Sequence, residues 1–200
     1  MPADFVYLAS ASPRRRELLC QIGVAFRVLS VAVDERALPK EAPEDYVLRL
    51  AKAKAEAGWP LRPSPDAGVL GADTAVVVDG EILGKPCDRA GGIAMLMRLS
   101  SRSHQVLTAV AVRCAGGVEA ALSRSEVTFR ALTEAEAQTY WDTGEPHDKA
   151  GGYAVQGLGA VFISALTGSF SGVMGLPLFE TARLLERVGI RHWNKVYGPQ

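Results

Sequence analysis

Apolar and polar positions alternate between two spacings along the chain. Short apolar runs bounded by turn residues predict strands, whereas apolar positions at i, i+3 and i+4 predict amphipathic helices. We expect strands at Phe5–Ala9, Ala25–Val33, Val69–Val78, Gln105–Val112, Val118–Phe129 and Val161–Ala165. We expect helices at Pro13–Gln21, Pro43–Ala57, Arg89–Leu99, Glu134–Asp142 and Leu178–Val188. Because helices and strands interleave, the pattern favours an α/β chain with a mixed sheet.

The chain has the length and apolar content of one folded unit. Its 200 residues are 48% hydrophobic, which is enough to bury one good core. The proline-rich segment 59–68 is more typical of a long loop than of a domain boundary, and no internal repeat is present. We therefore expect a single domain over residues 1–200.

Charge and cysteine content exclude several classes of protein. The 22 Lys and Arg residues balance 22 Asp and Glu residues, which argues against nucleic-acid binding through overall basicity. The three cysteines lie far apart without a metal-ligand spacing, so we expect reduced thiols. No apolar stretch approaches the roughly 20 residues of a membrane span, and the N-terminus lacks a signal-peptide pattern. We expect a cytoplasmic protein without a membrane partner.

An arginine cluster follows the first strand. The stretch FVYLASASPRRRELL predicts a strand, a tight loop and a helix that begins near Ser12, with Arg14, Arg15 and Arg16 in its first turn. The positive end of a helix dipole disfavours cations, so the cluster is either a solvated basic turn or part of an anion site. Because guanidinium groups contact phosphate oxygens at two points, the second alternative suggests a polyphosphate ligand.

Asp73 interrupts a strongly apolar strand in VLGADTAVVV. It could be a turn or strand-edge residue that caps its own backbone. Alternatively, it could be a carboxylate in a cleft that binds a metal ion or activates water, because an unpaired buried carboxylate is costly. The neighbouring Thr74 offers a hydroxyl group for recognition.

Three further charged groups are candidates. Asp34 and Glu35 follow an expected strand, and the alternation of side chains would let only one of them face a given cleft. Lys54 falls on the apolar stripe of its helix, where it either extends along the surface or reaches into a polar cleft. Lys85 lies on a Gly-Lys-Pro turn and is either an exposed loop lysine or a phosphate contact.

Several familiar nucleotide and metal motifs fail. GEILGKP lacks the spacing of a P-loop and has Pro86 where Ser or Thr should bind Mg²⁺. Gly157 and Gly159 do not extend into a dinucleotide-binding motif, because Phe162 occupies the last glycine position. The histidines lack zinc spacing, and no GxSxG motif is present. Gln156 lies in a loop before a strand, and its amide could both donate to and accept from a nucleobase edge.

Taken together, these stretches resemble the Maf family of nucleoside triphosphate pyrophosphatases. The resemblance runs in order through SASPRRREL, VDE, RLAKAKA, GADT, GKP, LSSRSHQVLTAV, DKAGGYAVQG and GSFSGVMGLPL. It implies an elongated mixed sheet flanked by helices, with two lobes around a cleft, similar to the inosine triphosphate pyrophosphatase fold. It further implies hydrolysis between the α- and β-phosphates with Mg²⁺ or Mn²⁺, and a homodimer.

The resemblance also assigns roles to residues. The catalytic acceptor falls on Asp73, and the specificity positions fall on Arg14, Thr74 and Gln156. Other cleft residues match Ser10, Arg15, Glu35, Lys54 and Lys85, with Glu35 and Asp73 as the expected metal ligands. The motifs GADT and YAVQG look like the dTTP/UTP type rather than the type that prefers 7-methyl-GTP.

These roles give a mechanism and two alternatives. Asp73 would orient a water or accept its proton, although nearby cations would be expected to lower the pKa of its carboxyl group. A non-enzymatic nucleotide sensor that regulates cell division would need only the cations. A phosphatase would use similar residues but release orthophosphate.

Overall fold

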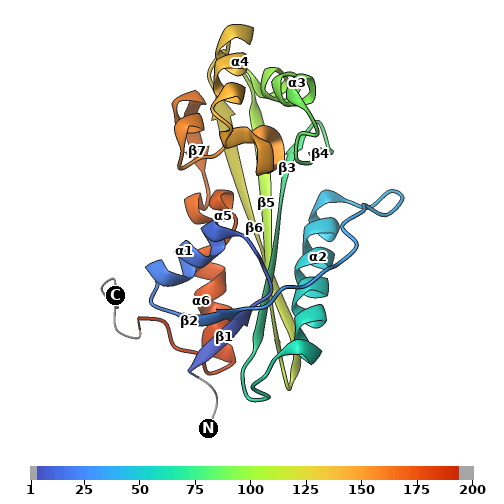
Figure 1. Cartoon of the computed structure of the whole chain (residues 1–200), viewed down its shortest axis with the longest axis vertical. Helices are drawn as coiled ribbons and strands as arrows, with labels where there is room; N and C mark the ends of the chain where they lie inside the picture. Colours follow the sequence, from blue (N-terminus) through green and yellow to red (C-terminus); the bar gives the residue numbers. More distant parts are fainter. Residues whose placement is uncertain (1–3, 194–200) are drawn as a thin grey trace.

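A computed structural model describes residues 4–193 as a seven-stranded mixed sheet flanked by helices (Figure 1). The strands are β1 (Phe5–Leu8), β2 (Ala25–Val28), β3 (Val69–Val78), β4 (Glu81–Leu83), β5 (Ser103–Cys114), β6 (Gly117–Phe129) and β7 (Ile163–Thr167). The helices are α1 (Pro13–Gln21), α2 (Pro43–Gly58), α3 (Arg89–Leu99), α4 (Glu134–Asp142), α5 (Phe170–Met174) and α6 (Leu178–Arg187). Short 3₁₀ turns are η1 (Trp59–Leu61), η2 (Glu145–Asp148), η3 (Ala150–Gly152) and η4 (Leu158–Phe162). The expected α/β fold is confirmed.

The long antiparallel strands β3, β5 and β6 form the spine of an elongated molecule (Figure 1). The strand order is β2-β1-β3-β5-β6-β7, with β4 on β3. β1 pairs in parallel with β2 and β3, which makes the sheet mixed. Helix α2 covers one face, where it contacts β3 and β5, and α6 covers the other, where it contacts β5 and β6 (Figure 1).

Separate apolar clusters lie toward the two ends of this spine and define two lobes. One cluster contains Leu96 of α3, Tyr140 of α4 and Phe162 of η4. Another contains Val6 of β1 and Leu185 of α6, on the opposite half of the sheet. The lobes share β3, β5 and β6, because these strands are long enough to contribute side chains to both clusters.

The edge of β3 is open between the lobes. One edge pairs with β5 continuously, whereas β1 pairs on the other edge only with Val69 and Leu70, and β4 pairs there only from Val76 onward. Residues 71–75 therefore have no strand neighbour on that side. Gly71 brings α2 close to this gap, because a Cβ atom there would lie 2.3 Å from the carbonyl oxygen of Ala51.

The structure corrects the expected strands in several places. The strand expected at Ala25–Val33 ends at Val28, because its parallel partner β1 ends at Leu8 and the chain then turns toward α1. β4 and α5 were not expected. Asp79 and Gly80, with φ of 54° and 77°, form the tight turn that joins β3 to β4. β7 begins later than the expected Val161–Ala165, because η4 occupies residues 158–162.

Local signals located most helix ends correctly. Helix α4 begins with the capping box of Thr133 and Glu136, in which each side chain bonds the other residue's backbone N–H.

Within residues 4–193, no helix is long and apolar enough to cross a bilayer.

Candidate active site

A cleft of about 590 Å³ lies between the two lobes at the open edge of β3. All of the residues predicted for the site line it: Ser10, Arg14, Arg15, Glu35, Lys54, Asp73, Thr74, Lys85 and Gln156. They come from elements far apart in the sequence, including α1, α2, β3 and the loop before η4. The structure brings the residues together, while their individual roles stay predictions.

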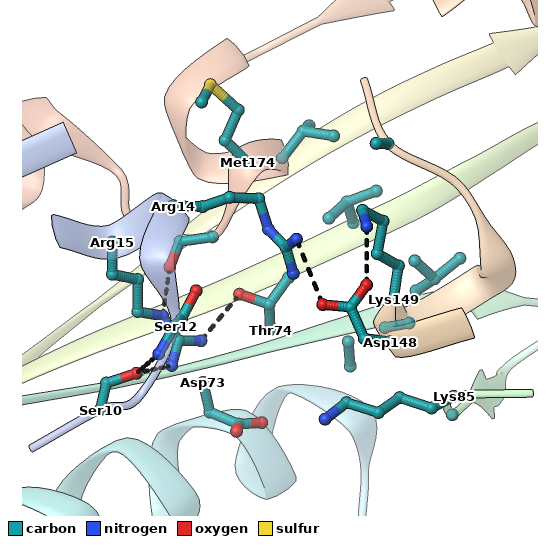
Figure 2. Close-up of a pocket in the computed structure, with 18 of the residues that line it drawn as sticks. Ser10, Ser12, Arg14, Arg15, Asp73, Thr74, Lys85, Asp148, Lys149 and Met174 are labelled. Atoms are coloured by element: carbon teal, nitrogen blue, oxygen red, sulfur yellow. Dashed lines mark hydrogen bonds and ion pairs between the residues drawn. The ribbon is translucent and has the colours of Figure 1, made fainter. Parts of the chain in front are cut away.

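Asp73 and Thr74 are adjacent on β3 and point to opposite faces of the sheet (Figure 2). In a strand paired on both edges, they would belong to two separate layers. Here the edge beside them is open, so both side chains border the same cleft. Asp73 is therefore neither a turn residue nor a backbone cap.

Asp73 lies on the face covered by α2. Its side chain is buried, and Oδ1 accepts a hydrogen bond from Lys54 Nζ at 2.7 Å. Oδ2 makes no hydrogen bond within residues 4–193, so it is available to a bound water. Burial raises the pKa of Asp73 above its ordinary value, and the attraction of Lys54 and Arg15 offsets this only in part. The cations do lower this pKa, as expected, but desolvation outweighs them and the net shift is upward.

Lys54 reaches into the cleft rather than along the surface. Its ammonium lies 2.7 Å from both Asp73 Oδ1 and Glu35 Oε1. The side chain is 12% exposed and joins the two carboxylates through one charge. The hydrogen bond from Lys54 lowers the pKa of Glu35, so that carboxylate is ionised at neutral pH.

Glu35 and Asp34 follow β2 in a segment that is not a strand, so the expected alternation of faces does not apply to them. Asp34 is exposed and accepts hydrogen bonds from Arg36. Glu35 is the member of the pair that lines the cleft, as the resemblance implied. Tyr46 donates to its backbone carbonyl at 3.0 Å and fixes the segment against α2.

Arg15 organises the opposite face of β3 (Figure 2). Its Nη1 donates to Ser10 Oγ at 3.0 Å, and its Nη2 lies 3.4 Å from Thr74 Oγ1. Its Nε donates to the carbonyl oxygen of Gly175 at 2.8 Å. This guanidinium is thus held between the β1–α1 loop and the end of α5.

The Thr74 hydroxyl has a defined orientation. Thr108 Oγ1 lies 2.7 Å from the carbonyl oxygen of Gly172 and 3.0 Å from Thr74 Oγ1. The geometry makes Thr108 the donor in both contacts, so its single proton is shared between the Gly172 carbonyl and Thr74 Oγ1, and Thr74 is the acceptor. Thr74 therefore accepts from Arg15 and Thr108, and its own proton has no acceptor within residues 4–193.

The arginine cluster divides between the cleft and the solvent. Arg14 and Arg15 line the cleft, whereas Arg16 is exposed outside it. Ser12 is the N-cap residue of α1, but its side chain makes no capping hydrogen bond. The amide groups of the first turn are therefore open to an anion, which supports the anion-site alternative for this loop.

Cations from the other lobe face these arginines. Lys85 follows β4, and Figure 2 shows its ammonium directed toward Asp73. Asp148 lies 3.7 Å from Arg14 and accepts a hydrogen bond from Lys149 at 2.6 Å (Figure 2). Sequence reasoning did not single out Asp148 or Lys149, although both begin the quoted DKAGGYAVQG stretch.

The carboxylates of Glu35 and Asp73 fit a divalent cation whose remaining ligands would be substrate oxygens. In the part of the chain that the structure describes, no group of three or more His, Cys, Asp or Glu side chains is placed to hold a metal. Glu35 and Asp73 nevertheless converge on one ammonium at 2.7 Å each. Mg²⁺ typically takes one or two carboxylates together with phosphate oxygens, which is the chemistry that these two residues and a triphosphate would supply.

Residues 5–188, which form the sheet and the cleft, match the family described as Maf-like protein. The chain belongs to this family. It is 52% identical over 181 residues to a dTTP/UTP pyrophosphatase of Pseudoalteromonas translucida, covering 90% of this chain and 95% of that protein. It is 54% identical over 196 residues to a dTTP/UTP pyrophosphatase of Alkalilimnicola ehrlichii, covering 94% and 96% of the two proteins.

A solved structure, that of the Staphylococcus aureus Ham1 protein, is also similar to part of the chain. It covers 62% of this chain and 71% of the other, with 13% identity and a TM-score of 0.42. A TM-score below 0.5 does not establish a shared fold, so the likeness to the inosine triphosphate pyrophosphatase fold stays a prediction.

Proposed function

We propose that this protein hydrolyses dTTP and UTP to the nucleoside monophosphate and pyrophosphate. Its Maf relatives, more than half identical over nearly their full length, are named dTTP/UTP pyrophosphatases. The observation that carries the proposal is the buried Asp73 carboxylate, whose pKa is raised, in a cleft whose lining includes Arg14, Arg15, Lys54, Lys85 and Lys149. Such a cleft can hold a polyanion and place a base beside it.

The cationic walls would bind the triphosphate. Arg14, the open amides of α1 and Lys85 offer phosphate contacts from both lobes. Arg15 is already bonded to Ser10 and Gly175, so it would contribute a fixed positive charge. Electrostatic stabilisation and positioning would supply most of the rate enhancement, as is usual in phosphoryl transfer.

Asp73 would act as the proton acceptor. The water oxygen forms a bond to the α-phosphorus while Asp73 takes its proton, and the bond to the bridging oxygen breaks. Pyrophosphate then leaves with that electron pair. Lys54 holds the carboxylate in place through its contact with Oδ1. A raised pKa makes Asp73 a stronger base than an exposed aspartate, which suits this role.

Glu35 and Asp73 would hold a divalent cation, Mg²⁺ or Mn²⁺, together with substrate oxygens. When bound, such a cation neutralises phosphate charge and acidifies a coordinated water. The homodimer and the cytoplasmic location implied by the resemblance also stay predictions.

Base selection would come from Thr74 and Gln156. Uracil and thymine present an N3–H donor between two carbonyl acceptors, whereas cytosine presents an acceptor at N3. The Gln156 amide can donate and accept at once, and the Thr74 hydroxyl, which accepts from Arg15 and Thr108, can donate its proton to a base carbonyl. Gln156→Glu should lower the rate on UTP relative to GTP, because a donor becomes an anionic acceptor. Unchanged relative rates would remove Gln156 from base selection.

The test is to measure pyrophosphate and orthophosphate released by the purified protein with Mg²⁺ or Mn²⁺ from dTTP, UTP, CTP, GTP and 7-methyl-GTP. We expect pyrophosphate from dTTP and UTP. Pyrophosphate chiefly from 7-methyl-GTP would keep the mechanism and overturn the specificity. Orthophosphate would indicate a phosphatase, and nucleotide binding without any product would favour the sensor.

A further inference from the structure

Glu145 in η2 was not among the predicted site residues. Its carboxylate accepts hydrogen bonds from α4 and from the start of η4. Its Oε1 accepts the Tyr140 hydroxyl at 2.6 Å and the Gly159 backbone N–H at 3.0 Å. Its Oε2 accepts the Leu158 N–H at 2.9 Å. These two amides begin η4, so the carboxylate satisfies a helix start that has no capping side chain of its own.

Tyr140 of α4 holds the other end of the same loop. Its buried hydroxyl accepts the Ala154 N–H at 3.1 Å while it donates to Glu145. We call Glu145 and Tyr140 the clamp. The clamp fixes Ala154 and Leu158, which lie two positions before and two positions after Gln156.

Gln156 itself has no such support. It is exposed at the turn, and its side chain makes no hydrogen bond within residues 4–193. Across the turn, only Gly157 N to Ala154 O, at 3.4 Å, links the described backbone groups. The direction of the Gln156 amide therefore depends on where the clamp holds the backbone on either side of it.

The clamp explains two glycines that match no nucleotide-binding motif. A Cβ atom on Gly157 would lie 2.1 Å from Glu145 Oε2, and one on Gly159 would lie 2.6 Å from the Tyr140 hydroxyl oxygen. The spacing in QGLG thus leaves room for a carboxylate and a phenol against the backbone. The lack of a side chain at these two glycines is therefore explained without any contact to a nucleotide.

The protonation states suit the clamp. Burial opposes ionisation of Glu145, but the hydrogen bonds from Tyr140, Gly159 and Leu158 outweigh it and lower the pKa of this carboxyl group. Burial and the contact with Glu145 raise the pKa of Tyr140, so it remains a donor. Lys149, which lines the cleft, also donates to the Glu145 backbone carbonyl at 2.7 Å.

We propose that Glu145 and Tyr140 are positioning residues that set the Gln156 amide and so determine the choice of base. The proposal rests on the proposed function, because it assigns a cause to the selectivity of that activity. The clamp lies behind the loop and is not part of the cleft lining. It acts through Gln156 and touches no substrate.

The test compares kcat/KM for UTP and CTP in Tyr140→Phe, which keeps the ring but removes the hydroxyl. We expect the UTP-to-CTP ratio to fall about three- to tenfold, the size of one lost hydrogen bond. Tyr7→Phe is the matched control, because the buried Tyr7 hydroxyl likewise accepts a loop amide, Ser64 N–H at 3.2 Å, away from the cleft. Its ratio should equal that of the wild type.

A double-mutant comparison separates positioning from general loss of stability. In a Gln156→Ala background, Tyr140→Phe should cause no further change in the ratio. An equal further fall would overturn the proposal, and so would a Tyr140→Phe enzyme with wild-type selectivity. If Tyr140→Phe does not fold by circular dichroism, Glu145→Gln serves in the same comparison. Wild-type protein that releases no pyrophosphate would instead overturn the proposed function.

Discussion

The two faces of the open β3 edge differ in chemistry although only one peptide bond separates Asp73 from Thr74. On the α2 face, two carboxylates meet one ammonium, and Asp73 is buried deeply enough for desolvation to control its pKa. On the other face, Thr74, Thr108 and Gly172 form a chain of neutral hydrogen bonds. Arg15 is bonded to that second face.

This difference shows how one open strand edge can present two kinds of side chain to the same ligand. A strand sends adjacent side chains to opposite faces, so a ligand normally meets only one of them. The gap between β1 and β4 exposes both faces to one cleft. We infer that the Asp73 face carries the chemistry and the Thr74 face contributes to selection of the substrate.

Asp73→Asn should give the largest effect. The amide cannot accept the water proton, so kcat for UTP should fall about 10²- to 10⁴-fold while nucleotide binding persists. Rate assays and calorimetric titration of the nucleotide would measure the two quantities. Asp79→Asn, on an exposed turn, is the control and should turn over normally. A near-normal rate in Asp73→Asn would remove Asp73 from the chemistry.

Lys54→Met should shift the pH dependence. Lys54 lowers the pKa of Asp73, so its removal should raise that pKa further and move the acid limb of kcat/KM to higher pH. The rate is lost as pH falls through the Asp73 pKa, because the protonated form cannot act as a base. Lys52→Met, at an exposed position of the same helix, should leave the limb in place. A limb that is unmoved by Lys54→Met would contradict the coupling.

Thr108→Val should affect only selection. It removes a donor to Thr74 Oγ1, which can then accept from a group in the cleft as well as donate to it. We expect the UTP-to-CTP ratio of kcat/KM to fall by about three- to tenfold. Thr108→Ser keeps the hydroxyl and should retain the ratio. Equal ratios in both variants would show that the hydroxyl orientation is irrelevant.

His104 tests stability apart from either face. It is buried against Tyr153, and burial lowers its pKa to about 4. The unfolded chain then binds a proton that the folded chain does not, so stability is full above about pH 6.5 and falls toward pH 4, by up to about 3 kcal/mol. In denaturant titrations, His104→Gln should flatten this slope. A slope unchanged by the substitution would assign the pH dependence to other groups.

Local patterns predicted β3 and every helix except α5 within the described residues, because helical spacing and apolar runs are properties of neighbouring residues. The end of β2 depended on its partner β1, which the sequence of β2 does not contain. The Asp79-Gly80 pair is a sequence signal for the hairpin that leads into β4. The comparison of GEILGKP with a P-loop did not make use of it.

The sequence predicted which residues line the candidate site, but it did not predict the direction of the Asp73 pKa shift. The resemblance placed Glu35 and Lys54 in the cleft, yet the sign of the Asp73 pKa shift required its burial, which arises from packing against α2. Glu145 gave no signal, because its partners Leu158 and Gly159 approach it only in the folded chain.

The most direct measurement is hydrolysis of UTP by the wild-type protein in water enriched in ¹⁸O, with mass analysis of both products. Attack of water on the α-phosphorus places one ¹⁸O in each UMP and none in pyrophosphate, which is the result we predict. Label in pyrophosphate, with unlabelled UMP, would mean attack at the β-phosphorus. That outcome would contradict the assignment of Asp73 as the base for water at the α-phosphate.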